Sequence, residues 1–379
     1  MINRERLIDL LLELVKIDSH SREESQIAAR LRPLLEEAGA SVSIDRAGET
    51  VGASVGNLIA RVPANDGKLP PLLLSAHMDT VAPGKGVRPL READRVRSDG
   101  NTILGADDKS GLAVIIETLR VINERNLPHG EIEVAFTICE EIGLLGAKAL
   151  DVAALRARHG IVLDSTTAST LFTRAPASDH FEFIVHGLEA HAGVCPERGI
   201  SAVRVAAEAI AAMPLGRIDA ETTSNVVVLE GGDGTNVVPN KCRVRGEARS
   251  LSDKTLAQQT AIIRRCFQDA AAAAKTTLDG KEQRAWIEER SERAYESMNV
   301  ADDCTIVGAV MRAAEVSSHP LRTASIGGGS DANVFNKRGI QTVNLGTGMR
   351  DIHTVNEWLD LQDFIACADI VLACATGAS

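Results

Sequence analysis

The stretch PLLLSAHMD, residues 71–79, decides how the chain folds. Leu72, Leu73 and Leu74 are apolar at consecutive positions, so other parts of the chain must cover both faces of this strand. Further apolar runs of strand length lie at residues 41–45, 57–62, 132–138, 160–163 and 342–345, and helical patterns alternate with them at residues 3–17, 23–38, 111–123 and 361–374. This alternation predicts an α/β fold in which helices cover a mixed sheet.

The middle of the chain has a different order of elements. Between about residues 173 and 292 we expect strands at 181–186, 224–230, 241–250 and 284–289, with helices at 200–212 and 253–274. The order βαββαβ is typical of a ferredoxin-like α+β unit. At 379 residues the chain is long enough for two domains. The sequence predicts one discontinuous domain at residues 1–173 and 294–379, and an inserted domain at residues 174–293.

Composition excludes several classes of partner. The net charge of −11 disfavours binding to nucleic acid, and aromatic residues, at 3%, are too few for base-stacking surfaces. No apolar stretch is long enough to predict a membrane span, and charged residues such as Arg4 and Asp9 interrupt the first helical pattern where a signal peptide would be apolar. Seven cysteines without a CxxC pair favour a reducing compartment. We therefore expect a cytoplasmic protein.

Acidic residues and histidines follow the predicted strands. They are His77 and Asp79, Asp107 and Asp108, Glu140 and Glu141, Asp164, and far downstream His353. Each motif alone is also typical of an ordinary feature: an exposed strand end, a helix N-terminus that favours acids, or a solvated turn. In the segment His77-x-Asp79 both side chains point to the same side of an extended backbone, so the acid can orient an imidazole that binds a metal ion.

Taken together, these motifs indicate a metal centre. Open α/β sheets bind their ligands at the carboxyl ends of the strands, where these residues lie. Nitrogen and oxygen ligands without a thiolate suit zinc, or manganese or cobalt in its place. Five ligands are too many for one open catalytic zinc ion, but they fit two ions that share a carboxylate and activate a water molecule.

In sequence, the chain resembles the dinuclear metallopeptidase family that includes peptidase T, carboxypeptidase G and the aminoacylases. The resemblance covers essentially the whole chain, and ILGADDKSG at 103–111 and FTRAP at 172–176 are most similar to the peptidase T-like branch. It implies that residues 1–173 and 294–379 form a catalytic metal-binding domain. It also implies that residues 174–293 form a lid and dimerisation domain.

The resemblance implies a role for each residue of the metal centre. His77 and Asp164 would bind one ion, Glu141 and His353 the other, and Asp107 would bridge both. The Asp107–Asp108 peptide bond would be cis. Asp79 would orient His77, and Glu140 would act as the general base.

The predicted lid carries three further candidates by the same resemblance. His191, in HGLEAHAG at 186–193, would donate a hydrogen bond to the oxyanion in the active site of the partner subunit of a homodimer. Asn236 and Arg249 would hold the substrate, since an arginine fork suits the carboxylate of a peptide. For Arg249 a salt bridge within the lid is an equally open alternative.

The expected function is metal-dependent hydrolysis of short peptides, as in a tripeptidase or aminopeptidase. Two alternatives stay open on the sequence. One is an amidohydrolase or carboxypeptidase of the same family that acts on N-acyl or N-carbamoyl amino acids. The other is a metal-binding protein without catalysis, against which the presence of Glu140 argues because simple binding needs no general base.

Overall fold

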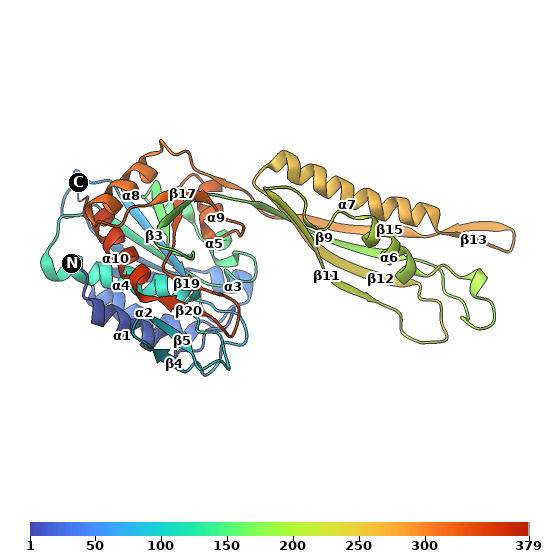
Figure 1. Cartoon of the computed structure of the whole chain (residues 1–379), viewed down its shortest axis with the longest axis horizontal. Coiled ribbons are helices and arrows are strands. Elements are labelled where there is room, and N and C mark those ends of the chain that lie inside the picture. The colour runs from blue at the N-terminus through green and yellow to red at the C-terminus, as the bar shows by residue number, and fades with distance from the viewer. Residues whose placement is uncertain (378–379) are drawn as a thin grey trace. The chain divides into compact units, whose positions relative to one another are not determined.

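The computed structural model describes residues 1–377 and divides the chain into two compact units. The larger unit contains Met1–Ala175 and the segment that begins at Met298, and the inserted unit contains Pro176–Ser297. Figure 1 shows the course of the chain through both. Within residues 1–377, every helix is too short or too polar to cross a membrane.

A nine-stranded mixed sheet forms the centre of the larger unit. Its order is β1 (Ser41–Ile44), β2 (Leu58–Val62), β6 (Ile132–Thr137), β3 (Leu72–His77), β7 (His159–Val162), β18 (Gln341–Leu345), β8 (Thr170–Ala175) and β16 (Met298–Asn299), with β17 (Arg322–Ser325) paired to β8. The neighbours β6, β3, β7 and β18 run parallel. Every residue of β3 and β6 is buried, as the consecutive apolar runs predict. The predicted helix-covered mixed sheet is confirmed.

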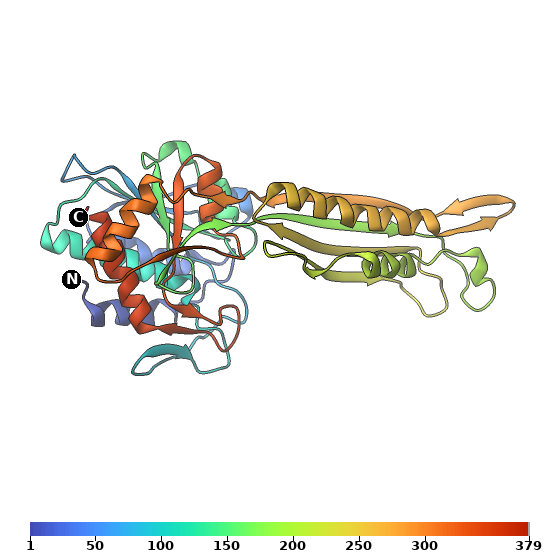
Figure 2. The same ribbon diagram turned by 45° about the horizontal axis from the view of Figure 1, so that its top comes forward.

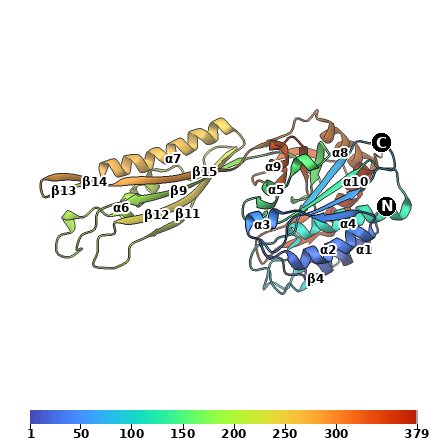
Figure 3. The same ribbon diagram turned by 180° about the vertical axis from the view of Figure 1, so that it is seen from behind.

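Helices cover both faces of this sheet. α4 (Ala106–Arg125), α8 (Thr305–Val316) and α10 (Leu361–Ala375) lie on one side of β3, and α3 (Ala47–Val51), α5 (Leu145–Ala149) and α9 (Asp331–Lys337) lie on the other, as Figures 1 and 3 show from opposite directions. α1 (Arg4–Leu14) and α2 (Ser25–Glu37) pack against α4, and a short 3-10 turn follows α5 at Val152–Ala154. The sheet is therefore closed to water except at its edges and strand ends.

A small antiparallel sheet lies beside the N-terminal end of α4. It contains β19 (Met349–Arg350), β20 (Trp358–Asp360), β5 (Arg95–Ser98) and β4 (Pro89–Arg91) in that order. The sequence did not predict it, because its strands have two to four residues and too little periodicity to recognise. Its functional consequence is that the loop between β19 and β20, which carries His353, is held in place.

The inserted unit is a five-stranded antiparallel sheet in the order β10 (Gly216–Arg217), β11 (Thr222–Gly231), β12 (Lys241–Ser250), β9 (Ala177–His186) and β15 (Trp286–Tyr295). The unit also contains two helices, α6 (Ala202–Ala212) and α7 (Asp253–Ala273), and a 3-10 turn at Pro196–Arg198. Residues of β12 alternate between buried and exposed, so one face packs against the helices. The rings of Phe183 and Phe267 stack there at 4.2 Å.

One prediction for this unit is wrong in detail. The strand expected at 284–289 is two elements: β14 (Lys281–Arg284) pairs with β13 (Lys275–Leu278), and β15 starts only at Trp286. Figure 2 shows the hairpin projecting past the end of the sheet. Its turn is Asp279-Gly280, both with positive φ, which is a hairpin signal that could have been recognised. Charged residues on its exposed face hid the second half of β15.

Candidate metal centre

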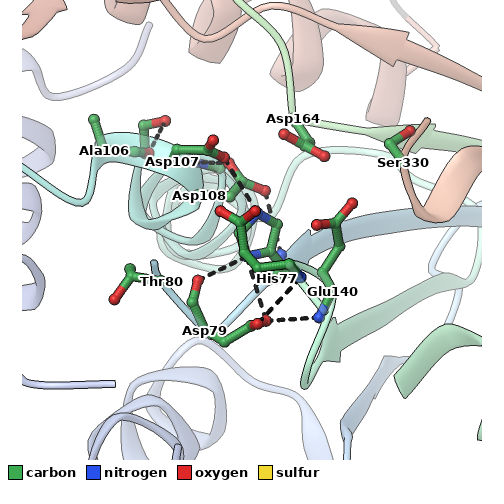
Figure 4. Close-up of polar contacts among 12 residues, drawn as sticks. His77, Asp79, Thr80, Ala106, Asp107, Asp108, Glu140, Asp164 and Ser330 are labelled. Carbon is green, nitrogen blue, oxygen red and sulfur yellow. Dashed lines mark hydrogen bonds and ion pairs between the residues drawn. The ribbon is translucent and has the colours of Figure 1, made fainter. Parts of the chain in front are cut away.

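The parallel strands bring four of the predicted motifs to one edge of the sheet. His77 is the last residue of β3, Glu140 and Glu141 follow β6, and Asp164 follows β7. Asp107 lies at the start of α4, where the backbone is not yet helical. Because neighbouring parallel strands end at the same edge, the side chains of Asp107, Glu140 and Asp164 gather around that of His77 (Figure 4).

Two groups of side chains have the geometry of an ion site. The ligand atoms of His77, Asp107 and Asp164 lie within 4.8 Å of one another, and so do those of Asp107, Glu141 and His353. The two oxygens of Asp107 face different histidines, with Oδ1 at 3.2 Å from His77 Nε2 and Oδ2 at 3.1 Å from His353 Nε2. Asp107 therefore belongs to both groups, and all five predicted ligands come together.

The spacing and the donor set fit divalent ions. His353 Nε2 lies 2.9 Å from Glu141 Oε1. Two donor atoms that bind one zinc ion at about 2.0–2.2 Å are at most about 4.4 Å apart. The distances from His353 Nε2 to Asp107 Oδ2 and Glu141 Oε1 are below this limit, so they are compatible with bound zinc. Both groups offer only imidazole nitrogen and carboxylate oxygen, which suit zinc, manganese or cobalt. The peptide bond between Asp107 and Asp108 is cis, as the resemblance implied.

The electrostatics of the cluster favour added positive charge. Burial raises the pKa of Glu140 and Asp164 well above the usual range of carboxyls, and neighbouring carboxylates add to the shift. Hydrogen bonds to Asp107 and Glu141 raise the pKa of His353 to about 10. Burial opposes ionisation of Asp107, but hydrogen bonds from His353 and His77 lower its pKa below the usual range. Carboxylates outnumber histidines in the cluster, and cations there would relieve this repulsion.

Asp79 acts mainly on the backbone next to the cluster. Its Oδ1 accepts a hydrogen bond from Glu140 N at 2.9 Å, and its Oδ2 accepts from Glu141 N at 3.2 Å and Ser21 Oγ at 2.6 Å. The nearest partner of His77 Nδ1 is the backbone oxygen of Asp79 at 2.8 Å, while the carboxylate oxygen Oδ1 lies at 3.5 Å. Asp79 thus contacts both the imidazole of His77 and the backbone of Glu140 and Glu141.

Three residues that support the cluster were missed from sequence. Glu24 accepts one hydrogen bond from the backbone N–H of Cys139. Asn344 exchanges two hydrogen bonds with the backbone of Asp164, and Glu357 accepts from the loop that carries Asp107. No sequence pattern marks them, since their partners lie 115 to 253 positions away.

The candidates of the inserted unit lie in two places. His191 is exposed and forms an isolated bridge with Val237, next to the exposed Asn236, in the loops that follow β9 and β11. Arg249 lies near the other end of the sheet, because β12 pairs it with Ser178 at the start of β9. Its guanidinium donates to Glu247 at 3.0 Å, so the salt bridge considered from sequence is present. Within this unit Arg249 is therefore not brought together with His191.

The chain is similar to a known peptidase family and to several solved structures. The model of the peptidase family M20/M25/M40 matches residues 73–376. The uncharacterized protein YqjE of Bacillus subtilis is 39% identical over 98% of each chain. The crystal structure of aminopeptidase PepT from Bacillus cereus is 40% identical with a TM-score of 0.87 and covers 99% of this chain and 98% of that one. A tripeptidase from Staphylococcus aureus is 34% identical with a TM-score of 0.91 and the same coverage.

Proposed function

We propose that the substrates of this protein are di- and tripeptides. The premise is that the chain belongs to the peptidase family M20/M25/M40 and is a hydrolase of peptide bonds. The expected product is the N-terminal residue. The similarity to an aminopeptidase and a tripeptidase supports this choice. The observation that carries the proposal is the pair of ligand groups that share Asp107, with the buried Glu140 beside them.

His77, Asp107 and Asp164 would hold one divalent ion, and Asp107, Glu141 and His353 the other, zinc being the first choice. Bound there, the ions lower the pKa of water toward about 7 and polarise the scissile carbonyl. Glu140 is the general base: its carboxylate accepts the proton of the attacking water and then gives it to the leaving amine. Burial keeps this carboxyl away from bulk water, which favours transfer within the site.

Asp79 positions Glu140 in this scheme. Its carboxylate holds the backbone of both Glu140 and Glu141, so the base and one ligand keep a fixed distance. The inserted unit serves as a lid and dimerisation domain, with His191 donating to the oxyanion across a homodimer. Asn236 and Arg249 contact the substrate, and the protein acts in the cytoplasm. These parts of the proposal rest on the sequence resemblance.

The experiment is an assay of purified protein, loaded with zinc or manganese, on panels of tripeptides, dipeptides, N-acyl amino acids and N-carbamoyl amino acids. We expect turnover of tripeptides with a free amino group. Glu140→Gln should reduce kcat by about 10²–10⁴-fold without loss of ions. Glu131→Gln, at an acid that pairs with Arg156 outside the cluster, is the matched control. Turnover of acylated substrates alone would replace the peptidase by an amidohydrolase, and full activity of Glu140→Gln would contradict the role of the base.

A further inference from the structure

Glu357 is a buried carboxylate with an unusual set of partners. Its side chain is 1% exposed. Oε2 accepts hydrogen bonds from the backbone N–H groups of Leu104 and Gly105, both at 2.8 Å, and Oε1 accepts from that of Asp107 at 3.1 Å. The carboxylate therefore accepts from three backbone N–H groups within four residues, at the point where the chain enters α4.

These donors have no other natural partner. Leu104 and Gly105 precede α4, and Asp107 lies at its non-helical start, so the carbonyls of the helix do not accept from these N–H groups. Gly105 has no side chain that could accept. Gly105 also has φ +74, a backbone conformation that aims its N–H toward Glu357 and that larger residues rarely adopt. Burial raises the pKa of Glu357 to about 7, and the backbone hydrogen bonds oppose this shift by favouring the charged form.

Glu357 also belongs to the loop that carries the other histidine ligand. It lies four positions after His353, between β19 and β20, and its own N–H donates to Thr354 O at 3.1 Å. This one loop thus places His353 Nε2 next to Asp107 Oδ2, and its Glu357 accepts a hydrogen bond from the backbone N–H of Asp107. Both ends of the His353–Asp107 contact are fixed by the same loop.

We infer that Glu357 is a positioning residue for the ion held by Asp107, Glu141 and His353. It sets the distance between the bridging carboxylate and His353, and its effect should appear in ion affinity. Groups that orient metal ligands typically change affinity by about 10–100-fold when they are replaced. The inference rests on the proposed two-ion site.

The test is a titration of metal-free protein with Zn²⁺ in competition with a chromophoric chelator, compared for the wild type, Glu357→Gln, Glu357→Asp and Glu133→Gln. Glu133 is the matched control, because it is a fully buried carboxylate that accepts from the N–H groups of Arg156 and Ala157, both at 2.8 Å. It lies near the start of β6, where it pairs with Leu73 near the start of β3, at the opposite end of these strands from His77.

In the Gln variant an amide NH₂ group faces backbone donors, and in the Asp variant the charge is kept but the reach is shortened by one methylene. We expect both to bind one of the two ions about 10–100-fold more weakly, and Glu133→Gln to bind both ions as the wild type does. Unchanged affinity in Glu357→Gln, wild-type affinity in Glu357→Asp, or equal weakening in Glu133→Gln would overturn the inference. If Glu357→Gln does not fold, Glu357→Asp decides. A wild type that binds no ions would instead refute the proposed site itself.

Discussion

Removal of the proposed ions should lower the free energy of unfolding of the larger unit, by an amount that depends on how many ions its ligand groups hold. The proposed site would hold two ions per chain, one in each of the two groups that share Asp107. At a free-ion concentration of 100 times the dissociation constant, each ion adds about 2.7 kcal/mol to the free energy of unfolding, or about 5.4 kcal/mol for two. For domains of about 150–250 residues, 1 kcal/mol shifts Tm by roughly 2–4 °C, so we expect a shift of about 10–20 °C.

The assay is differential scanning calorimetry of metal-free protein in zinc buffers of rising free concentration. His353→Ala is the informative variant, because it removes a ligand of one group and leaves His77, Asp107 and Asp164 in place. It should retain about half of the shift. The two-ion reasoning is refuted if the wild type shows no shift at saturating zinc, or if His353→Ala shows the full one.

Three further predictions concern pH, the support of the base, and the inserted unit. In metal-free protein the raised pKa values of Glu140 and Asp164, and that of His353 at about 10, mean that the folded state holds more protons than the unfolded state, so the free energy of unfolding should fall as pH rises from about 6 to 9. Ion binding requires deprotonated ligands, so zinc-loaded protein should not show this fall in urea titrations, and parallel curves would contradict it. Asp79→Asn can satisfy only one of two backbone donors with its single oxygen, and should cost about 1–3 kcal/mol in urea unfolding of metal-free protein. His191→Ala should lower kcat by about 10²–10³-fold with unchanged ion content, and a wild-type kcat would exclude it as an oxyanion donor.

Local sequence patterns were sufficient to predict the strands that bear the site. A run such as Leu72–Leu74 must be covered on both faces, so the burial of β3 followed from its pattern of consecutive apolar residues. His77 and Glu141 could be recognised because metal ligands must be particular residue types at the ends of such strands. The choice of five candidate ligands, scattered from position 77 to position 353, came from the resemblance to a known family, and the structure brings their side chains together.

The supporting residues could not be predicted in this way. Glu24 and Glu357 are ordinary acids in sequence, and their role depends on backbone N–H groups that any residue could supply. The short strands β4, β5, β19 and β20 likewise form only because they pair with one another. Hydrogen bonds to the backbone carry no side-chain signature, so no local pattern reveals them.

The sequence by itself determined the helix-covered mixed sheet, because consecutive apolar residues must be buried on both faces of a strand. The sequence also suggested the candidate ligands, but their roles came from the resemblance to a known family. Only the tertiary structure decided that one oxygen of Asp107 faces His77 and the other faces His353. It also decided that Arg249 lies away from His191, and that Glu357 accepts hydrogen bonds from the Asp107 loop. Such facts depend on distances between segments far apart in the chain, which are fixed by packing of the whole unit rather than by any one stretch of residues.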